Sequence, residues 1–212
     1  MRRILRVLIY IIGLGILSLG VVLNTKTGLG VSAVNSIPYV CSQITGISLG
    51  TLTMMVYGIY IAVQIILLRK TFKVSILLQL PCSVLFGKYT DFFNQLIQIE
   101  PGTIGGKFLL LSAAILLTAL GVVLTVTMQI VPNAPDGLVQ VIAMQVKKEF
   151  GYIKNIFDGV SVLVSIIISL LIERHLIGIG IGTIASALLI GRFIALFNKL
   201  GKEKLKSLVS GQ

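Results

Sequence analysis

The sequence predicts an all-α integral membrane protein with six transmembrane helices, arranged as two inverted repeats of three helices each. Three observations lead to this fold class. Hydrophobic residues make up 56% of the 212-residue chain and charged residues only 12%, about half the charged share of a soluble domain. Six apolar runs are long enough to cross a bilayer, which needs about 17–25 residues. Several short motifs of the first half also recur in the second half.

The six runs follow one another along the whole chain. They are Ile4–Leu23, Leu49–Leu68, Val74–Leu96, Phe108–Val131, Ile153–Ile172 and Leu176–Phe197. Because hydrocarbon offers no water to the backbone, each run has to be helical. The first run resembles a signal peptide, but its length and the lack of an Ala-x-Ala site indicate a retained span. Pro81 should kink the third run, and Gln64 in the second run suits a hydrogen bond between helices.

The internal repeat is carried by matching residues in the two halves. Leu85–Leu96 recurs as Leu189–Leu200, with Gly87 and Gly191 104 residues apart, and Leu19–Leu23 recurs as Leu120–Leu124 at a separation of 101. We therefore divide the chain into a first repeat (1–100), a second repeat (101–200) and a basic cytoplasmic tail (201–212). Three spans per copy is an odd number, so the second copy must enter the membrane from the opposite face. Inverted repeats of this kind are common among secondary transporters.

Basic residues predict the orientation of the spans. Thirteen flank the spans on one side of the membrane: Arg2, Arg3, Arg6, Arg69, Lys70, Lys73, Lys147, Lys148, Lys154, Lys199, Lys202, Lys204 and Lys206. The alternate loops hold only Lys26, Lys107 and Arg174. The positive-inside rule then places both termini in the cytoplasm. The formal net charge of +11 thus reflects topology, and we expect lipid rather than nucleic acid as the partner of this chain.

Two shorter segments, 31–47 and 132–148, occupy equivalent places in the two repeats. Each combines apolar residues at helical spacing with polar ones, and the second opens on Pro132-Asn-Ala-Pro-Asp136, a breaker followed by a helix N-cap residue. We predict one short amphipathic helix in each segment, either flat at the interface or re-entrant. Counting both as spans would give eight spans in parallel copies, but both are short and polar for hydrocarbon.

Two cations fall inside predicted spans, at equivalent positions of the repeat. Lys88 lies in the third span with Asp91 three residues later, and Arg192 lies in the sixth. A charge near the bilayer centre costs about 2.5–3.5 kcal/mol, so it is usually kept for pairing or binding. Lys88 therefore either pairs with Asp91, extends to the headgroups, or meets an anionic solute. Arg192 has the same choice between the headgroups and the solute.

Other polar and small residues complete the predicted site. Asn35 and Asp136 are equivalent in the repeat and lie in the short segments, where they are candidates for solute binding. Asp158 near the start of the fifth span is either a helix-start carboxylate or a proton-coupling group. Small residues recur at four-residue spacing in the sixth span and predict close helix packing, within the chain or in a homo-oligomer; they are Gly178, Gly182 and Ser186.

Motifs for enzymatic chemistry are missing from the sequence. We find no nucleophile elbow, zinc-protease motif or phosphate loop, and the spacing of Cys41 and Cys82 fits no metal site. We therefore expect no catalytic activity, metal or cofactor.

The chain resembles the YczE/YyaS/YitT group of bacterial integral membrane proteins. The likeness is carried by Thr27-Gly28-Leu29-Gly30, Gly46-Ile47-Ser48-Leu49-Gly50-Thr51, Pro135-Asp136-Gly137-Leu138 and Phe150-Gly151. Members of that group often have Gly-Leu-Gly-x-x-Pro-Trp-Asp in the first copy, whereas this chain has no Trp and has Asn35 near the expected Asp. The resemblance implies a bacterial plasma-membrane protein without established activity.

These observations favour a permease for a small, anionic solute. Two alternatives stay open: an accessory or regulatory membrane protein that acts on a partner, and the substrate-binding subunit of a larger uptake complex.

Overall fold

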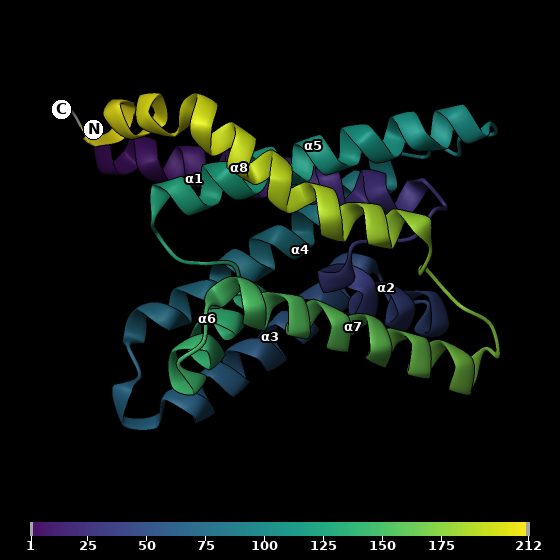
Figure 1. Ribbon diagram of the computed structural model, residues 1–212, viewed down its shortest axis with the longest axis horizontal. Helices are drawn as coiled ribbons and strands as arrows, with labels where there is room; N and C mark the ends of the chain where they lie inside the picture. The colour runs from purple at the N-terminus through teal and green to yellow at the C-terminus, as the bar shows by residue number, and fades with distance from the viewer. Residues whose placement is uncertain (1, 211–212) are drawn as a thin grey trace. The chain divides into compact units, whose positions relative to one another are not determined.

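The computed structural model describes residues 2–210. The side chains of residues 2, 70 and 201–210 lie outside the description, so only the helical backbone of residues 201–210 is described for the predicted basic tail (201–212). In this part of the chain eight α-helices and no strand are found (Figure 1). The helices are α1 (Arg2–Lys26), α2 (Ala33–Thr45), α3 (Leu49–Leu68), α4 (Gln79–Leu96), α5 (Ile104–Met128), α6 (Ala134–Val146), α7 (Phe150–Ile172) and α8 (Ile181–Ser210).

Five of these helices are long and apolar enough to cross a membrane. The chain is therefore a multi-pass membrane protein. The five segments are Arg3–Lys26, Leu49–Leu68, Ile104–Met128, Phe150–Ile172 and Ile181–Leu200.

The predicted third span, Val74–Leu96, differs from the prediction. It consists of a 3₁₀ helix, η2 (Val74–Leu78), followed by α4 with only 18 residues, and α4 is not among the five apolar helices. Pro81 does not kink a continuous helix as predicted, because α4 begins at Gln79, two residues before it. A proline is tolerated in the first turn of a helix, where its missing N–H would have no intrahelical partner.

The order of helices repeats along the chain. Each half holds a long helix, a short helix and two further helices. α2 begins at Ala33 and α6 at Ala134, and α3 begins at Leu49 and α7 at Phe150, so both separations are 101 residues. This is the separation at which the sequence motifs recur.

The chain forms two compact units, and each unit draws residues from both halves of the sequence. Unit 1 consists of Met1–Ser32, Phe92–Ile130 and Gly180–Gln212, and unit 2 of Ala33–Asp91 and Val131–Ile179. The compact units therefore do not coincide with the sequence repeats.

In unit 1, α1 and α5 pack against each other with almost no space between their backbones. A Cβ atom added to Gly20 would lie 2.6 Å from the Thr118 amide nitrogen, and one added to Gly121 would lie 2.5 Å from the Leu17 amide nitrogen. Gly20 and Gly121 are equivalent in the repeat, and so are Leu17 and Thr118. The contact is thus self-complementary, as across a two-fold axis. The pairing also shows that α1 and α5 run antiparallel, as Figure 1 shows.

In unit 2, each short helix packs mainly on a helix of the other half, α2 on α7 and α6 on α3, and also on the next helix of its own half. Ser165 Oγ donates a hydrogen bond to Ser36 Oγ (2.9 Å) between α7 and α2. At the equivalent place, Gly137 of α6 approaches Gln64 of α3, and a Cβ there would lie 2.8 Å from the amide oxygen of Gln64.

Both short helices exist as predicted, and they are packed within unit 2. Their buried residues are Ala33, Asn35, Ser36, Pro38 and Val40 in α2, and Ala134, Pro135, Gly137, Leu138, Val139, Val141 and Ala143 in α6. A helix lying flat at the interface would keep its polar face in water. Burial of Asn35 and Ser36 means that other helices cover the polar face of α2.

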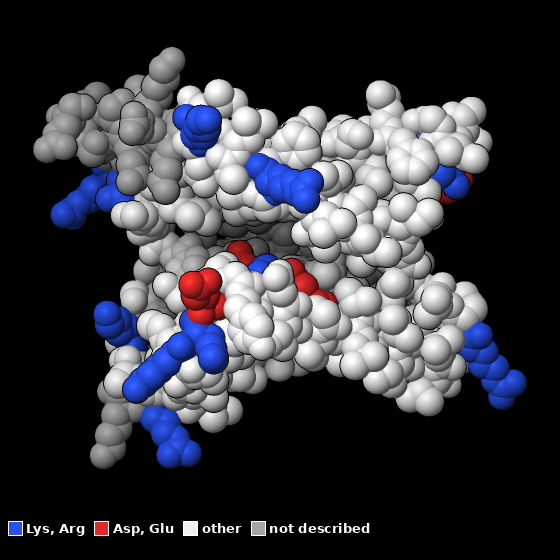
Figure 2. Space-filling model, in the orientation of Figure 1, with Lys and Arg blue, Asp and Glu red and all other residues white. Residues whose placement is uncertain are grey.

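The outer face of α7 is apolar along most of its length. Its exposed large residues recur every three or four positions: Tyr152, Ile156, Val160, Leu163, Ile167 and Leu170. In Figure 2 most of the surface over α7 carries no charge. Such a stripe is typical of a helix with one face toward lipid.

Candidate functional site

A cluster of three charged side chains lies in unit 2, between α6 and α7. The Lys154 Nζ atom is 3.2 Å from Asp136 Oδ1 and 3.2 Å from Asp158 Oδ1. The side chains of Lys154 and Asp158 are 22% exposed and that of Asp136 is 31% exposed. These are the two ion pairs found among the described side chains. Two carboxylates face one ammonium group, so the fully ionised cluster carries a net charge of −1.

The local sequence explains how these groups meet. Lys154 and Asp158 are four residues apart on α7 and therefore share one face of that helix. Asp158 is eight residues beyond Phe150, about 12 Å along the helix axis, so it lies well inside the span. Asp136 lies in the first turn of α6, where the helix dipole favours an acidic side chain. Asn133 caps this helix by accepting a hydrogen bond from the Ala134 N–H (3.1 Å).

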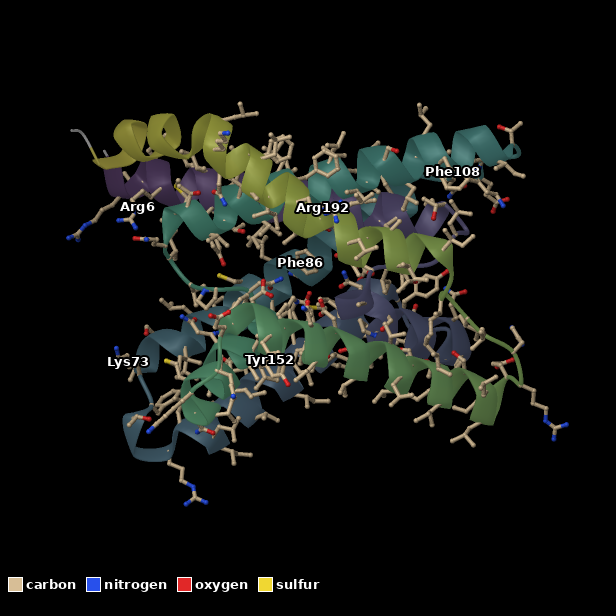
Figure 3. All side chains as sticks on the ribbon, in the orientation of Figure 1. Arg6, Lys73, Phe86, Phe108, Tyr152 and Arg192 are labelled. Atoms are coloured by element: carbon tan, nitrogen blue, oxygen red, sulfur yellow. The ribbon has the colours of Figure 1, made fainter. Side chains whose placement is uncertain are left out.

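A series of packed aromatic side chains from α7, α3 and α4 begins at the cluster. The Lys154 Nζ atom lies 5.7 Å from the centre of the Phe157 ring, within the range of a cation–π contact. Tyr60 packs edge-on against Phe157, and Tyr57 stacks between Tyr60 and Phe86. Tyr57 and Phe86 are each 1% exposed. Figure 3 labels Phe86 on α4.

The Tyr60 hydroxyl group beside this cluster is a buried polar group that lacks a hydrogen bond of ordinary geometry among the described residues. Tyr60 is only 9% exposed. Its hydroxyl lies near Ser161 and within the electrostatic reach of Lys154 and Asp158. Buried hydroxyl groups are usually satisfied, and Ser161 is a group to which the Tyr60 hydroxyl can donate, so the lone pairs of the Tyr60 oxygen can still accept a further partner.

A pair of buried amides holds the start of α6 in place. The Gln64 Nε2 group donates to Gln79 Oε1 (2.9 Å), and Gln79 Nε2 donates to Gln64 Oε1 (3.0 Å). Gln64 Nε2 also donates to the Ala134 carbonyl oxygen (3.2 Å). The predicted role of Gln64 in joining helices is therefore confirmed. Because Asp136 follows Ala134 by two residues, this pair also positions the ion cluster.

The Lys88–Asp91 pair considered from the sequence is not formed. The Asp91 carboxylate faces the N-terminus of α3, where it accepts hydrogen bonds from the Gly50 N–H (2.7 Å) and the Ser48 hydroxyl (2.8 Å). A carboxylate is favoured there because the helix dipole and the free N–H groups attract it. Lys88 is exposed on α4. Asp91 thus has a helix-capping position, and a role of Lys88 in solute binding stays a prediction.

The remaining predicted residues are divided between the two units. Arg192 is exposed on α8 of unit 1 (Figure 3), whereas Asn35 is buried on α2 of unit 2.

Of the predicted small-residue stripe, two members pack within unit 1. Gly182 donates its N–H to the Leu29 carbonyl oxygen (2.7 Å), and the buried Ser186 hydroxyl accepts a hydrogen bond from Asn24 Nδ2 (2.8 Å). Gly178 is not part of the stripe, because α8 begins only at Ile181. It adopts a positive φ of 67° and approaches the Tyr39 ring instead.

Asp136 and Asp158 are the predicted residues that the structure brings together. Lys154, which joins them, was counted with the basic residues that flank the spans, although it already falls within the predicted fifth span; in the structure it lies on α7, which begins at Phe150. The spacing of Lys154 and Asp158 could have revealed the pair. No sequence signal pointed to Tyr57, Tyr60 or Gln79. No group of three or more His, Cys, Asp or Glu side chains lies together in the part of the chain that the structure describes.

A comparison with protein families identifies the family of the chain. Residues 4–199 match the model of a family of unknown function (DUF6198), and the chain belongs to this family. No curated protein and no solved structure matches the chain. The resemblance to the YczE/YyaS/YitT group stays a prediction.

Proposed function

We propose that this member of the DUF6198 family is a permease for a small polar solute, with its solute site at Asp136, Lys154 and Asp158. The observation that carries the proposal is the ion cluster inside α7. Ionisable groups within apolar spans are costly, and they commonly mark a solute or ion pathway. The cluster also lies where a short, buried helix begins, as in transporters that build their sites from discontinuous helices.

The antiparallel packing of α1 and α5 supports an inverted repeat. These helices are equivalent in the two halves, and two spans that run in opposite directions cross the membrane with opposite polarity. We take α4 as a sixth span, so that both termini lie on the cytoplasmic side of the bacterial plasma membrane. The basic residues outside the spans support this orientation even when Lys154 is removed from the count.

The anionic solute favoured from the sequence depended on Lys88 and Arg192. Both side chains are exposed and belong to different units. The cluster in unit 2 has an excess of negative charge. The solute site proposed here therefore depends on the carboxylates of α6 and α7 and not on those two cations.

The test begins with a thermal-shift screen of small metabolites on purified protein at several pH values and Na⁺ concentrations. Solutes that raise the unfolding temperature are then offered to proteoliposomes as labelled compounds. We expect Asp158→Asn to lower uptake at least about tenfold, corresponding to about 1.4 kcal/mol. Gly159→Ala, next to it on α7 with open space around the added Cβ, should keep wild-type uptake.

Two results would contradict the proposal. If Asp158→Asn takes up solute as wild type does, the cluster is not part of the solute pathway. If uptake is lost in the Lys88→Ala/Arg192→Ala double variant but kept in Asp158→Asn, the anionic site predicted from the sequence is favoured. Co-purification of a membrane partner, together with no solute-dependent thermal shift, would favour the accessory protein.

A further inference from the structure

We propose that the Lys154 ammonium group occupies a cation site, and that a small monovalent cation competes with it for Asp136 and Asp158. The cation would be an alkali-metal ion or the protonated amine of a solute. This inference deepens the proposed function, because it names the chemical class of solute that the same site would accept.

The charge of the cluster favours a cation as its ligand. One ammonium group stands against two carboxylates, and both Nζ–Oδ1 distances are 3.2 Å. Lys154 therefore acts as a shared cation between two acidic side chains from different helices. An incoming cation would find the same two oxygen ligands, and the net charge of −1 would attract it. An anion would be repelled by both carboxylates.

A buried hydroxyl group supports the same inference independently of charge. The Tyr60 hydroxyl is buried next to the cluster and makes no hydrogen bond of ordinary geometry among the described residues. Its oxygen can accept a hydrogen bond from an ammonium group or bind a metal cation. A lysine side chain anchored on α7 already reaches both carboxylates, whereas a free cation can add this third oxygen.

A nearby aromatic ring can hold the Lys154 ammonium group when a cation displaces it from the carboxylates. Its side chain is flexible, with a compact charge at the end of four methylene groups. The Phe157 ring, on the same helix, already lies 5.7 Å from Nζ and can hold the displaced ammonium over its face.

The ionisable groups around the site come from three helices. Tyr57 and Tyr60 face it from α3, Asp136 from α6, and Lys154 and Asp158 from α7. Lys154 is thus the resident cation of this set, and its removal should expose the site to ions from solution.

The experiment compares thermal unfolding of the purified full-length protein in different chloride salts at equal ionic strength. The probes are Na⁺, K⁺, methylammonium and the bulky cation N-methyl-D-glucamine. For Lys154→Gln we expect stabilisation by at least one small cation but not by N-methyl-D-glucamine. The half-maximal concentration should be at least about tenfold below that of wild type, because the internal competitor is gone. Methylammonium would identify an amine solute, and Na⁺ or K⁺ a metal ion.

Matched variants make the result specific. Asp136→Asn should abolish the cation effect in the wild-type background, and Arg192→Gln, which removes an exposed cation in unit 1, should leave it unchanged. Equal unfolding temperatures of Lys154→Gln in all four salts would overturn the inference. So would equal stabilisation by N-methyl-D-glucamine, which would indicate surface screening.

If Lys154→Gln does not fold, unfolding temperatures of wild type and Asp158→Asn are compared in the same salts at higher cation concentration. A shift in wild type that Asp158→Asn loses supports the site, and equal shifts overturn it. Cation binding without uptake of any solute would contradict the permease and leave the cation site standing.

Discussion

The two compact units are built on opposite packing principles. Unit 1 joins α1 and α5 through glycines, with backbone against backbone and no ion pair among its described side chains. Unit 2 joins its helices through an ion cluster, an amide pair and a carboxylate cap. Close glycine packing leaves no room for a ligand, whereas the polar contacts of unit 2 can exchange partners. The candidate site therefore lies in unit 2.

Separating the backbones of α1 and α5 in unit 1 should have the largest effect on stability. Gly121→Leu places a Cβ atom about where the Leu17 backbone lies, 2.5 Å from its nitrogen. We expect a loss of about 3 kcal/mol or more, because neither helix backbone can move aside without breaking the interface. The measurement is thermal unfolding in detergent. Gly159→Ala in unit 2, with no atom within 4 Å of the added Cβ, should be neutral or slightly stabilising.

Removing the central charge of unit 2 should have the next largest effect. Lys154→Met leaves two carboxylates facing each other without their cation, and we expect it to cost about 3 kcal/mol. Unfolding should be followed in N-methyl-D-glucamine chloride, so that no small cation replaces the ammonium. The neutral triple variant Asp136→Asn/Lys154→Met/Asp158→Asn should regain most of the loss. A triple variant as unstable as the single one would mean that packing, and not charge, explains the effect.

The amide pair of unit 2 should show strong coupling between its members. Gln64→Leu leaves the Gln79 amide and the Ala134 carbonyl group without a partner, at a cost of about 1–3 kcal/mol. Gln64→Leu/Gln79→Leu removes both amides, so its loss should be smaller than the sum of the two single losses. A double-mutant cycle from unfolding curves measures this coupling, and additive losses would count against the reciprocal pair.

The smallest effects should separate two charged residues of α4. Asp91→Asn weakens the charged hydrogen bonds that cap α3, and we expect a loss of about 1 kcal/mol. Lys88→Gln should stay within about 0.5 kcal/mol of wild type, because the side chain is exposed. Unfolding temperatures of the two variants test the difference. A larger loss for Lys88→Gln would reverse the roles assigned to them.

Much of this fold follows from hydrophobic periodicity. The bounds of α3 were predicted to the residue, and α2 and α6 were expected from breakers and helical spacing in segments 31–47 and 132–148. The spacing of the repeat, visible in Leu19–Leu23 and Leu120–Leu124, also appears in the helix boundaries. These features are local, so the sequence reveals them directly.

The partners of polar side chains were harder to predict, because tertiary packing decides them. A pair of Asp91 with Lys88 was one of the alternatives that their spacing allowed, yet Asp91 faces the free N–H groups of another helix. Lys154 was counted as a basic residue flanking the spans, whereas in the structure it lies on α7 and joins two carboxylates. The exchange of short helices between the halves left no pattern in the sequence, since it depends on contacts more than one hundred residues apart, such as Ser36 with Ser165.

The exchange of short helices has a consequence for biosynthesis. When the first half leaves the ribosome, α2 has no α7 to cover it, and α3 waits for α6. Neither half can complete a compact unit from its own residues, so the polar faces of α2 and α3 must be tolerated, or shielded by the insertion machinery, until translation ends. We therefore expect this protein to complete folding only after the whole chain is made, and a truncated product to be an early target for membrane proteases.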